Sequence, residues 1–493
     1  MSITDAGQAR ARRVRAVRFL RAWAPLVALL AALLAPAAPA SAQAGPRPNV
    51  LLIQTDDQTL ESMRVMPNAR RLLAAQGVTF ANSFVSLSEC CPSRATLLTG
   101  QYAHNHGVLS NHHPSGGYYK LDNRNTLAVW LRRSGYYTAM VGKYLNEYGN
   151  RNQREVPPGW SEWYVRSDNP SYYDYTINHN GRLLKVGGGP ADYSTDRFTR
   201  HTVSLVRARA RSRQPFFIYT GFFAPHGAAP PERERYLSGL DAPIPARRHL
   251  GRFDRTPLPR PPSFNEPDIA DKPESIREQE PIPADKVAAI TRGYRRQLES
   301  LLAVDEGVRS IVTALSQTRQ LGRTIIIFTS DNGFINGEHR IPDGKLLPYE
   351  PSIRVPLIVR GPGLPRGQIR RQLVANVDLA PTITAVTRAR PGRVMDGLSL
   401  MGFARQPGRA SGRSILLESG VRVQEENQFA GIRTQRYTYV EFADGERELY
   451  DNLRDRHQLV NQAANRAMSA ARAGLARRLA VLRRCRGSAC RGA

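Results

Sequence analysis

The sequence predicts an α/β fold, in which a large and mostly parallel sheet is flanked by helices. Two short apolar runs, at residues 49–53 and 324–329, lack polar alternation, which is typical of strands buried on both faces of a sheet. Segments with helical periodicity separate such runs, and strands that alternate with helices indicate a parallel sheet. The 493 residues are enough for one large domain and a smaller one.

The large domain is expected to span residues 46–388. Further strands are expected at residues 216–219 and 355–359, and helices at residues 126–134 and 284–315. The first two apolar runs each end directly before a pair of polar side chains. In parallel sheets such residues, just beyond the strand C-termini, line the ligand crevice, so we expect a functional site at this edge of the sheet.

A smaller subdomain of antiparallel strands and one helix is expected at residues 389–493. Its expected elements are strands at residues 414–418, 429–434 and 437–442, a segment at residues 448–451 that precedes a turn, and a helix at residues 462–484. Within the large domain, residues 228–285 are rich in proline and charge. An irregular segment of this length predicts a packed surface lobe or the wall of a substrate cleft rather than a hinge.

The N-terminus predicts a secretory signal peptide at residues 1–42. A run of arginines precedes the apolar residues 24–34, and Ala40, Ser41 and Ala42 offer a small-residue cleavage site. The apolar run is too short for a comfortable transmembrane helix, and an uncleaved membrane anchor is the alternative. We therefore expect a secreted or otherwise extracytoplasmic protein, soluble after removal of the signal peptide and without a stable membrane span.

The formal net charge of +28 comes from 70 Lys and Arg against 42 Asp and Glu, and only six of the basic residues are Lys. The arginine excess has two readings. It reflects either a coding bias with many solvated side chains or a basic surface that attracts polyanions such as sulfated glycans. The arginines are scattered and no recognition-helix or RNA-binding motif is present, so no nucleic-acid partner is expected.

The four cysteines fall into two pairs. Cys485 and Cys490 frame a short loop, which is compatible with a small disulfide in an exported protein, although sequence alone does not fix the pairing. Cys90 and Cys91 open the string Cys-Cys-Pro-Ser-Arg-Ala-Thr-Leu-Leu-Thr-Gly at residues 90–100. A simple structural interpretation of this pair is a disulfide or half of a zinc site. However, adjacent cysteines rarely form a relaxed disulfide, and no second pair lies nearby to complete a zinc site.

This string resembles the signature of the sulfatase family, the formylglycine-dependent members of the alkaline-phosphatase-like superfamily. The resemblance implies that Cys90 is oxidised to formylglycine by a formylglycine-generating or maturase enzyme, and that the hydrated aldehyde is the nucleophile. It covers most of the predicted mature chain, because segments at residues 142–146, 224–227 and 330–333 follow in family order. Residues 102–106, Tyr-Ala-His-Asn-His, resemble the branch of the N-acetylglucosamine-6-sulfatases and the extracellular heparan-sulfate endosulfatases.

Two polar pairs that end apolar strands suggest a shared metal ion. Asp56 and Asp57 follow the first strand, and Asp331 and Asn332 follow a later one. Alone, each pair is more often a helix cap or a turn device. Together they offer oxygen donors that suit a hard cation, with Ca²⁺ preferred and Mg²⁺ less suitable. The resemblance implies one calcium ion per chain, with the modified Cys90 as a further ligand.

The resemblance also assigns catalytic roles. A sulfate monoester is anionic, so its cleavage needs positive charge around the sulfuryl oxygens, which Arg94, Lys143 and Lys345 would supply together with the metal. Arg94 would also orient the nucleophile. The departing alcohol needs a general acid, for which His226 is the first choice and Lys345 the second. A non-catalytic interpretation exists for each residue. His226 would be a turn histidine bonded to the backbone, and Lys143 and Lys345 would be ordinary surface lysines.

One position departs from the wider family. Many arylsulfatases have a histidine where this chain has Leu145, and Asn146 is the available substitute; the glucosamine-6-sulfatase branch shares this pattern. Four further histidines either line a sulfate–sugar pocket or lie in solvated loops: His104, His106, His112 and His113. Glu338 and His339 are expected to support the metal-binding loop.

The sequence thus predicts a secreted sulfatase that hydrolyses sulfate monoesters, with sulfated carbohydrates such as glucosamine 6-sulfate as the expected substrates. Two alternatives stay open. A phosphonate or phosphate-ester hydrolase would use the same scaffold, because selectivity depends on pocket charge that a sequence shows poorly. A non-catalytic polyanion-binding protein would keep the fold without the modification, although such a protein has no need of the recognition string around Cys90.

Overall fold

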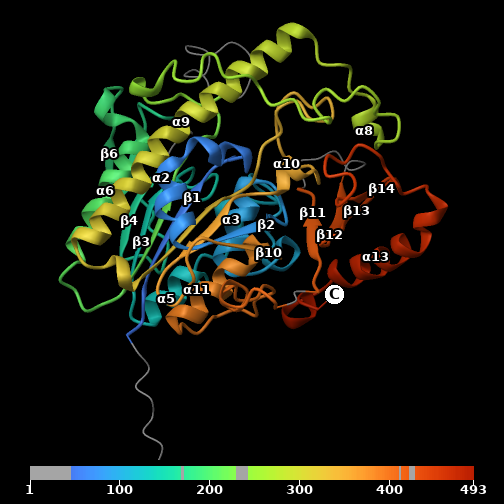
Figure 1. Cartoon of the computed structure of the whole chain (residues 1–493). Coiled ribbons are helices and arrows are strands. Elements are labelled where there is room, and N and C mark those ends of the chain that lie inside the picture. Colours follow the sequence, from blue (N-terminus) through green and yellow to red (C-terminus); the bar gives the residue numbers. More distant parts are fainter. Residues whose placement is uncertain (1–45, 168–170, 229–241, 410–411, 421–427, 493) are drawn as a thin grey trace, which may run out of the picture. The chain divides into compact units, whose positions relative to one another are not determined.

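A ten-stranded sheet forms the centre of the structure, a computed structural model (Figure 1). The strand order is β10-β2-β9-β8-β1-β7-β3-β4-β5-β6. Only β9 and β5 run against the other strands, so the predicted mostly parallel sheet is confirmed. The strands are β1 Asn49–Thr55, β2 Val78–Phe84, β3 Tyr137–Gly142, β4 Glu162–Arg166, β5 Thr176–His179, β6 Arg182–Lys185, β7 Phe216–Gly221, β8 Thr324–Ser330, β9 Leu357–Arg360 and β10 Gln368–Ala375.

The structure describes residues 46–167, 171–228, 242–409, 412–420 and 428–492. Residues 47–493 form one unit, and the predicted signal peptide at residues 1–42 lies outside the described residues. In the described ranges, no helix is both long enough and apolar enough to cross a membrane.

Helices cover both faces of the sheet because its central strands are apolar on both sides. Leu51 and Ile53 of β1 pack with α2, α6 and α9 on one face. Val50 and Leu52 pack with α3, α5 and α11 on the other. Figure 1 shows the long helix α9 lying across the first face. The helices are α2 Pro67–Leu72, α3 Cys90–Thr99, α4 Ala103–His106, α5 Leu127–Arg133, α6 Ser194–Ala208, α8 Glu274–Arg277, α9 Ala284–Gln317, α10 Glu350–Ile353, α11 Leu379–Thr387, α12 Met401–Arg405 and α13 Ser469–Leu482.

The elements expected from the sequence are found with small shifts of their ends. The helices expected at residues 126–134 and 284–315 are α5 and α9. The strand expected at residues 355–359 is β9, which is antiparallel to both of its neighbours. The connection between β8 and β9 spans residues 331–356 and contains one short helix, α10.

A four-stranded antiparallel sheet and α13 make up the C-terminal part, as predicted. The strands are β11 Ile415–Glu418, β12 Phe429–Arg433, β13 Tyr437–Phe442 and β14 Arg447–Asp451. The helix predicted from residue 462 starts later, at Ser469, because Asn465 accepts a hydrogen bond from the backbone of Ala467 and caps a separate 3-10 turn. The division of the chain at residue 388 stays a prediction.

The described part of the Pro-rich segment, residues 242–285, is mostly irregular. Leu258, Pro259 and Pro261 from this segment line a cavity of about 640 Å³ together with Tyr294 of α9 and Phe334. Phe334 lies two residues beyond Asn332 in the sequence. The segment thus supplies one wall of a cavity, and its contact with a substrate stays a prediction.

Candidate active site

Four oxygen-bearing side chains gather where β1 and β8 end side by side. The last residues of these two strands are register partners, so Asp56 and Asp331 follow at the same level of the sheet. The backbone N–H of Asp57 donates to Asp331 Oδ1 at 3.2 Å, and Asn332 Nδ2 donates to Asp57 Oδ1 at 2.6 Å. All four side chains are buried. The structure therefore brings together the residues that the sequence proposed as metal ligands.

Cys90 is the first residue of α3 and is fully buried. Its thiol donates to Asp56 Oδ1 at 3.4 Å, and Lys345 Nζ donates to its Sγ at 3.0 Å. Burial and the Asp56 carboxylate raise the pKa of the thiol, so the encoded side chain is a neutral thiol. The backbone N–H of Cys91 donates to Asn111 Oδ1 at 2.7 Å, which fixes the first turn of the helix.

Arg94 lies one turn further along α3 and connects three strand ends. Its Nε donates to Asp331 Oδ2 at 2.8 Å, and its NH2 group donates to Asp56 Oδ2 at 3.1 Å. Its NH1 group donates to the carbonyl of Lys143 at 2.9 Å. The side chain is 0% exposed, so it faces the carboxylates from inside the protein. This geometry favours a positioning role over direct contact with a substrate.

Two lysines pair with the same carboxylates. Lys143 directly follows β3 and forms an ion pair with Asp56. Lys345 forms an ion pair with Asp57 and contacts Cys90. Burial opposes the charge of Lys345, but the neighbouring carboxylates raise its pKa well above the ordinary value. Lys345 therefore stays positively charged beside the sulfur atom, and neither lysine is an ordinary surface residue.

His226 follows β7 and is held by the backbone while its other nitrogen faces the cluster. Its Nδ1 lies 2.7 Å from the carbonyl oxygen of Gly227. A carbonyl can only accept, so Nδ1 carries a proton. Its Nε2 lies 3.7 Å from Asp57 Oδ2. The turn-histidine reading and the functional reading are thus both compatible with this ring, and a proton on Nε2 would make it an imidazolium.

The oxygen cluster fits a hard cation. Asp57 Oδ2 and Asn332 Oδ1 are buried and have no hydrogen-bond partner among the described residues, a situation that costs roughly 1–3 kcal/mol per group. One ligand atom each of Asp56, Asp57, Cys90 and His226 lies within 4.8 Å of the others. Carboxylate and amide oxygens are the donors that Ca²⁺ prefers. A bound cation would satisfy both unpaired oxygens.

The formal charges of the side chains in this centre balance without a metal ion. Three carboxylates face three permanent positive charges: Asp56, Asp57 and Asp331 against Arg94, Lys143 and Lys345. Burial opposes ionisation of Asp56, but the surrounding cations keep its pKa well below the ordinary value. A divalent cation would leave the centre positively charged. Such a centre attracts an anionic ester and stabilises charge that develops on its oxygens.

Two further polar side chains, Ser93 and Asn376, support the end of β8. Ser93 Oγ donates to the backbone carbonyl of Asp331, and Asn376 Nδ2 donates to Ser93 Oγ at 2.9 Å. Ser93 belongs to the cysteine string, but Asn376 follows β10 and carries no local signal of its role. Leu145 packs in the hydrophobic core, whereas Asn146 Oδ1 is buried without a hydrogen-bond partner in the described ranges.

His104 and His106, for which the sequence left a sulfate–sugar pocket or a solvated loop open, both make hydrogen-bonded contacts around α4. His106 is buried, and its Nε2 lies 3.0 Å from Thr96 Oγ1; burial lowers its pKa to about 3. His112 is half-exposed, and its Nδ1 lies 3.3 Å from Glu147 Oε1. The rings of His104 and His106 are thus both engaged in contacts around α4.

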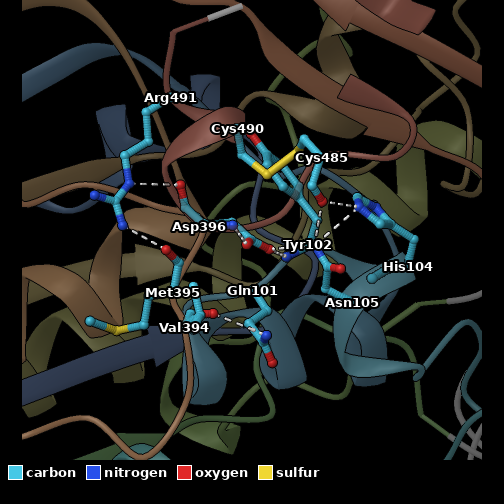
Figure 2. Close-up of a disulfide and its surroundings, with 12 residues drawn as sticks. Gln101, Tyr102, His104, Asn105, Val394, Met395, Asp396, Cys485, Cys490 and Arg491 are labelled. Atoms are coloured by element: carbon cyan, nitrogen blue, oxygen red, sulfur yellow. Dashed lines mark hydrogen bonds between the residues drawn. A yellow bond between two sulfur atoms is a disulfide. The ribbon is translucent and has the colours of Figure 1, made fainter. Parts of the chain in front are cut away.

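His104 instead holds the C-terminal disulfide, as Figure 2 shows. Cys485 and Cys490 are bonded. The carbonyl of Cys485 accepts hydrogen bonds from His104 Nε2 at 2.9 Å and from Asn105 Nδ2 at 2.8 Å. His104 Nδ1 lies 2.8 Å from Glu418 Oε1. Burial opposes ionisation, but Glu418 raises the pKa of His104, so the ring donates from both nitrogens and ties the C-terminus to the segment that follows α3.

Comparison with known proteins places these features in a family. The family model described as "Sulfatase" matches residues 48–389, and the model "N-sulphoglucosamine sulphohydrolase, C-terminal" matches residues 337–485. The chain is 34% identical over 385 residues to the human N-acetylglucosamine-6-sulfatase, covering 75% of this chain and 67% of that protein.

A second relative and one solved structure complete the comparison. The chain is 33% identical over 416 residues to a Caenorhabditis elegans extracellular sulfatase Sulf-1 homolog, covering 83% of this chain but only 54% of that protein. The chain therefore spans about half the length of this relative. A protein solved in complex with its substrate, D-glucosamine-2-N,6-O-disulfate, has the same fold, with a TM-score of 0.75, 24% identity, and coverage of 88% of this chain and 97% of that chain.

Proposed function

The chain belongs to the sulfatase family, and we propose that it hydrolyses sulfate monoesters of carbohydrates, with glucosamine 6-sulfate groups as the favoured substrate. The observation that carries the proposal is the position of Cys90. Its Sγ lies between the Asp56 carboxylate and Lys345 Nζ, at the edge of the sheet where the metal-binding oxygens meet. The substrate class is supported by the relative described as an N-acetylglucosamine-6-sulfatase.

We infer that two groups complete this centre. A calcium ion would be held by Asp56, Asp57, Asp331, Asn332 and the modified residue 90, and would neutralise charge on the sulfuryl oxygens. Oxidation of Cys90 to formylglycine would supply, after hydration, a nucleophile that can later release sulfate by re-forming the aldehyde. The maturing enzyme must act on the cysteine string, and the burial of Cys90 favours modification before the chain has folded.

The side chains of this protein would bind and orient the ester. Lys143 and Lys345 pair with the cluster carboxylates and are more exposed than Arg94, so they would contact the sulfuryl oxygens. Arg94 would act through Asp56 and Asp331, whose carboxylates it holds in place. These preorganised charges stabilise the charge that develops as the bond to the leaving oxygen breaks.

His226 is the proposed general acid. Its Nδ1–H is occupied by the Gly227 carbonyl, so the proton for transfer would be carried on Nε2, the nitrogen that faces the cluster, 3.7 Å from Asp57 Oδ2. Sugar alcohols leave poorly without a proton, whereas nitrophenol leaves well. His226→Gln is therefore expected to lower kcat for glucosamine 6-sulfate by about 10²–10⁴-fold, and that for nitrophenyl sulfate much less. Equal losses on both esters would move the role to Lys345.

The function is tested by combining mass spectrometry with turnover. Protein recovered from the medium of its native cell should show a loss of roughly 18 Da on the peptide that contains residue 90, as a thiol becomes an aldehyde. The same protein should release sulfate from glucosamine 6-sulfate, and Cys90→Ala should not. An unmodified thiol throughout the exported protein, with no turnover, would contradict the proposal and favour a polyanion-binding protein.

Comparing nitrophenyl esters of sulfate, phosphate and a phosphonate separates the remaining alternative. A sulfatase should give the highest kcat/KM with the sulfate ester. A preference for the phosphonate would identify a phosphonate hydrolase on the same scaffold. Recovery from the medium would also test secretion, which is supported by the relative named as an extracellular sulfatase.

A further inference from the structure

Glu162, His179 and His201 form a compact cluster outside the active site. They come from three elements: the start of β4, the end of β5 and the middle of α6. The Nε2 atoms of His179 and His201 lie 2.9 Å and 3.0 Å from the same oxygen, Glu162 Oε1. One ligand atom of each residue lies within 4.8 Å of the other two.

The three groups are held by a second layer of contacts. Asn180 Nδ2 donates to the other carboxylate oxygen, Glu162 Oε2, at 3.0 Å, which turns Oε1 towards the histidines. The ring of His201 stacks on Tyr164 with centroids 3.8 Å apart. Partial burial opposes ionisation of Glu162, but the contacts with His201 and Asn180 lower its pKa to about 2. Such outer contacts orient ligands in protein metal sites.

The cluster is accessible and separate from the strand ends. The side chains of His179, His201 and Glu162 are 37%, 17% and 12% exposed, so a hydrated ion can reach them. Glu162 pairs with Ala139 of β3, three residues before Gly142, whereas Lys143 follows that strand. At about 3.3 Å per residue, this places the cluster on the order of 10 Å below the active-site edge.

We propose that Glu162, His179 and His201 bind a second metal ion of the zinc type, with water in the remaining positions. Two imidazole nitrogens and one carboxylate oxygen are a ligand set that Zn²⁺ uses in proteins, whereas calcium prefers oxygen alone. The active-site cluster and this cluster thus differ in metal preference. This inference is independent of the proposed function.

The N···O separations of 2.9 Å and 3.0 Å fit such an ion after a small adjustment. With metal–ligand bonds of about 2.0–2.2 Å, N···O separations near 3 Å correspond to angles of about 90° at the metal. A tetrahedral angle requires separations of about 3.3–3.4 Å, a movement of about 0.4 Å. Each imidazole must offer a lone pair at Nε2, so its proton there moves to Nδ1 or leaves for solvent. The bound ion would replace two hydrogen bonds and cross-link the β4–β5 hairpin to α6.

The test titrates the full chain with zinc chloride in an isothermal calorimeter, after chelator treatment and with calcium in excess so that the strand-end site is filled. His201→Asn and Glu162→Gln should each weaken zinc binding at least about tenfold, because loss of an outer-shell partner alone costs 10–100-fold. His112→Asn is the matched control, because the His112 ring also contacts a glutamate, whereas the neighbouring His113 contacts that carboxylate through its backbone N–H.

A second readout locates the ion. Anomalous diffraction from zinc-soaked crystals should give a peak among the three side chains. In thermal unfolding, zinc should raise the unfolding temperature of the parent and of the His112 variant but not of the His201 variant. Zinc binding that is unchanged in both cluster variants would overturn the proposal. A zinc peak only at the strand ends, or no peak, would also overturn the proposal. The cluster would then be a set of hydrogen bonds without a metal role. Glu162→Gln keeps the shape of the side chain, so a folded variant is available if the histidine variants fail to fold.

Discussion

Replacing Arg94 by methionine tests whether this buried guanidinium organises the active site. Arg94 bridges Asp56 and Asp331, with no exposure of any of the three side chains. Removing one member of a buried ion pair costs about 3–5 kcal/mol, because a buried charge is left uncompensated. Asp56 keeps its contact with Lys143, and Asp331 keeps two backbone N–H donors. The expected loss is therefore near the low end, about 3 kcal/mol.

The assay measures the free energy of unfolding in urea, with and without calcium, alongside kcat/KM for a sulfate ester. Calcium should reduce the stability loss, because the cation partly compensates the two carboxylates. Turnover per folded molecule should fall about 10²-fold, the scale of a misplacement of reacting groups by about 1 Å. Arg413→Met is the matched control, since Arg413 is equally buried and contacts both oxygens of Asp378 at 3.0 Å and 2.9 Å.

The control should lose similar stability but keep its turnover per folded molecule. Two results would refute the reasoning. An Arg94 variant as stable as the parent without calcium would show that the bridge contributes nothing. An equal loss of turnover in the Arg413 variant would show that the effect is general destabilisation rather than positioning.

Three further predictions concern the cation, pH and the disulfide. Removal of calcium with a chelator should abolish turnover and lower the free energy of unfolding by about 2.7 kcal/mol relative to calcium at 100 times its Kd; full recovery with magnesium alone would contradict the calcium assignment. Burial raises the pKa of Glu448 from 4.5 to about 7, so the folded chain keeps a proton that the unfolded chain has lost. This contribution to stability is fully present below pH 4.5 and is lost as pH rises through 7, by up to about 3 kcal/mol. Unfolding curves measured across this pH range should lose this dependence in Glu448→Gln. Replacing both Cys485 and Cys490 by serine should lower the free energy of unfolding by about 2 kcal/mol for so short a loop. It should leave kcat nearly unchanged, because His104 and Asn105 contact the backbone carbonyl of residue 485. Urea unfolding and initial rates measure both effects, and a large loss of kcat would show that the disulfide shapes the active site.

The sequence predicted the site where local patterns are strong. The apolar run before Asp56 predicts a buried strand, and the eleven residues from Cys90 are specific enough to identify a family. Lys143 and His226 follow strands β3 and β7, so the rule that ligands bind beyond strand C-termini already places them at one edge. The sequence carried no signal of the contacts of His104, because its partners Glu418 and Cys485 lie more than 300 residues away in the sequence.

By itself, the sequence determined the fold class, the family and the residue types available for chemistry, because periodicity and short motifs depend on neighbouring residues. Only the tertiary structure decided which charges meet. It buries Arg94 between Asp56 and Asp331 and brings Lys345 to the sulfur of Cys90. It also leaves Asp57 Oδ2 and Asn332 Oδ1 without a hydrogen-bond partner among the described residues and gathers Glu162, His179 and His201 from three elements. Such contacts depend on strand register and helix packing, which join residues that are distant along the chain and leave no local pattern.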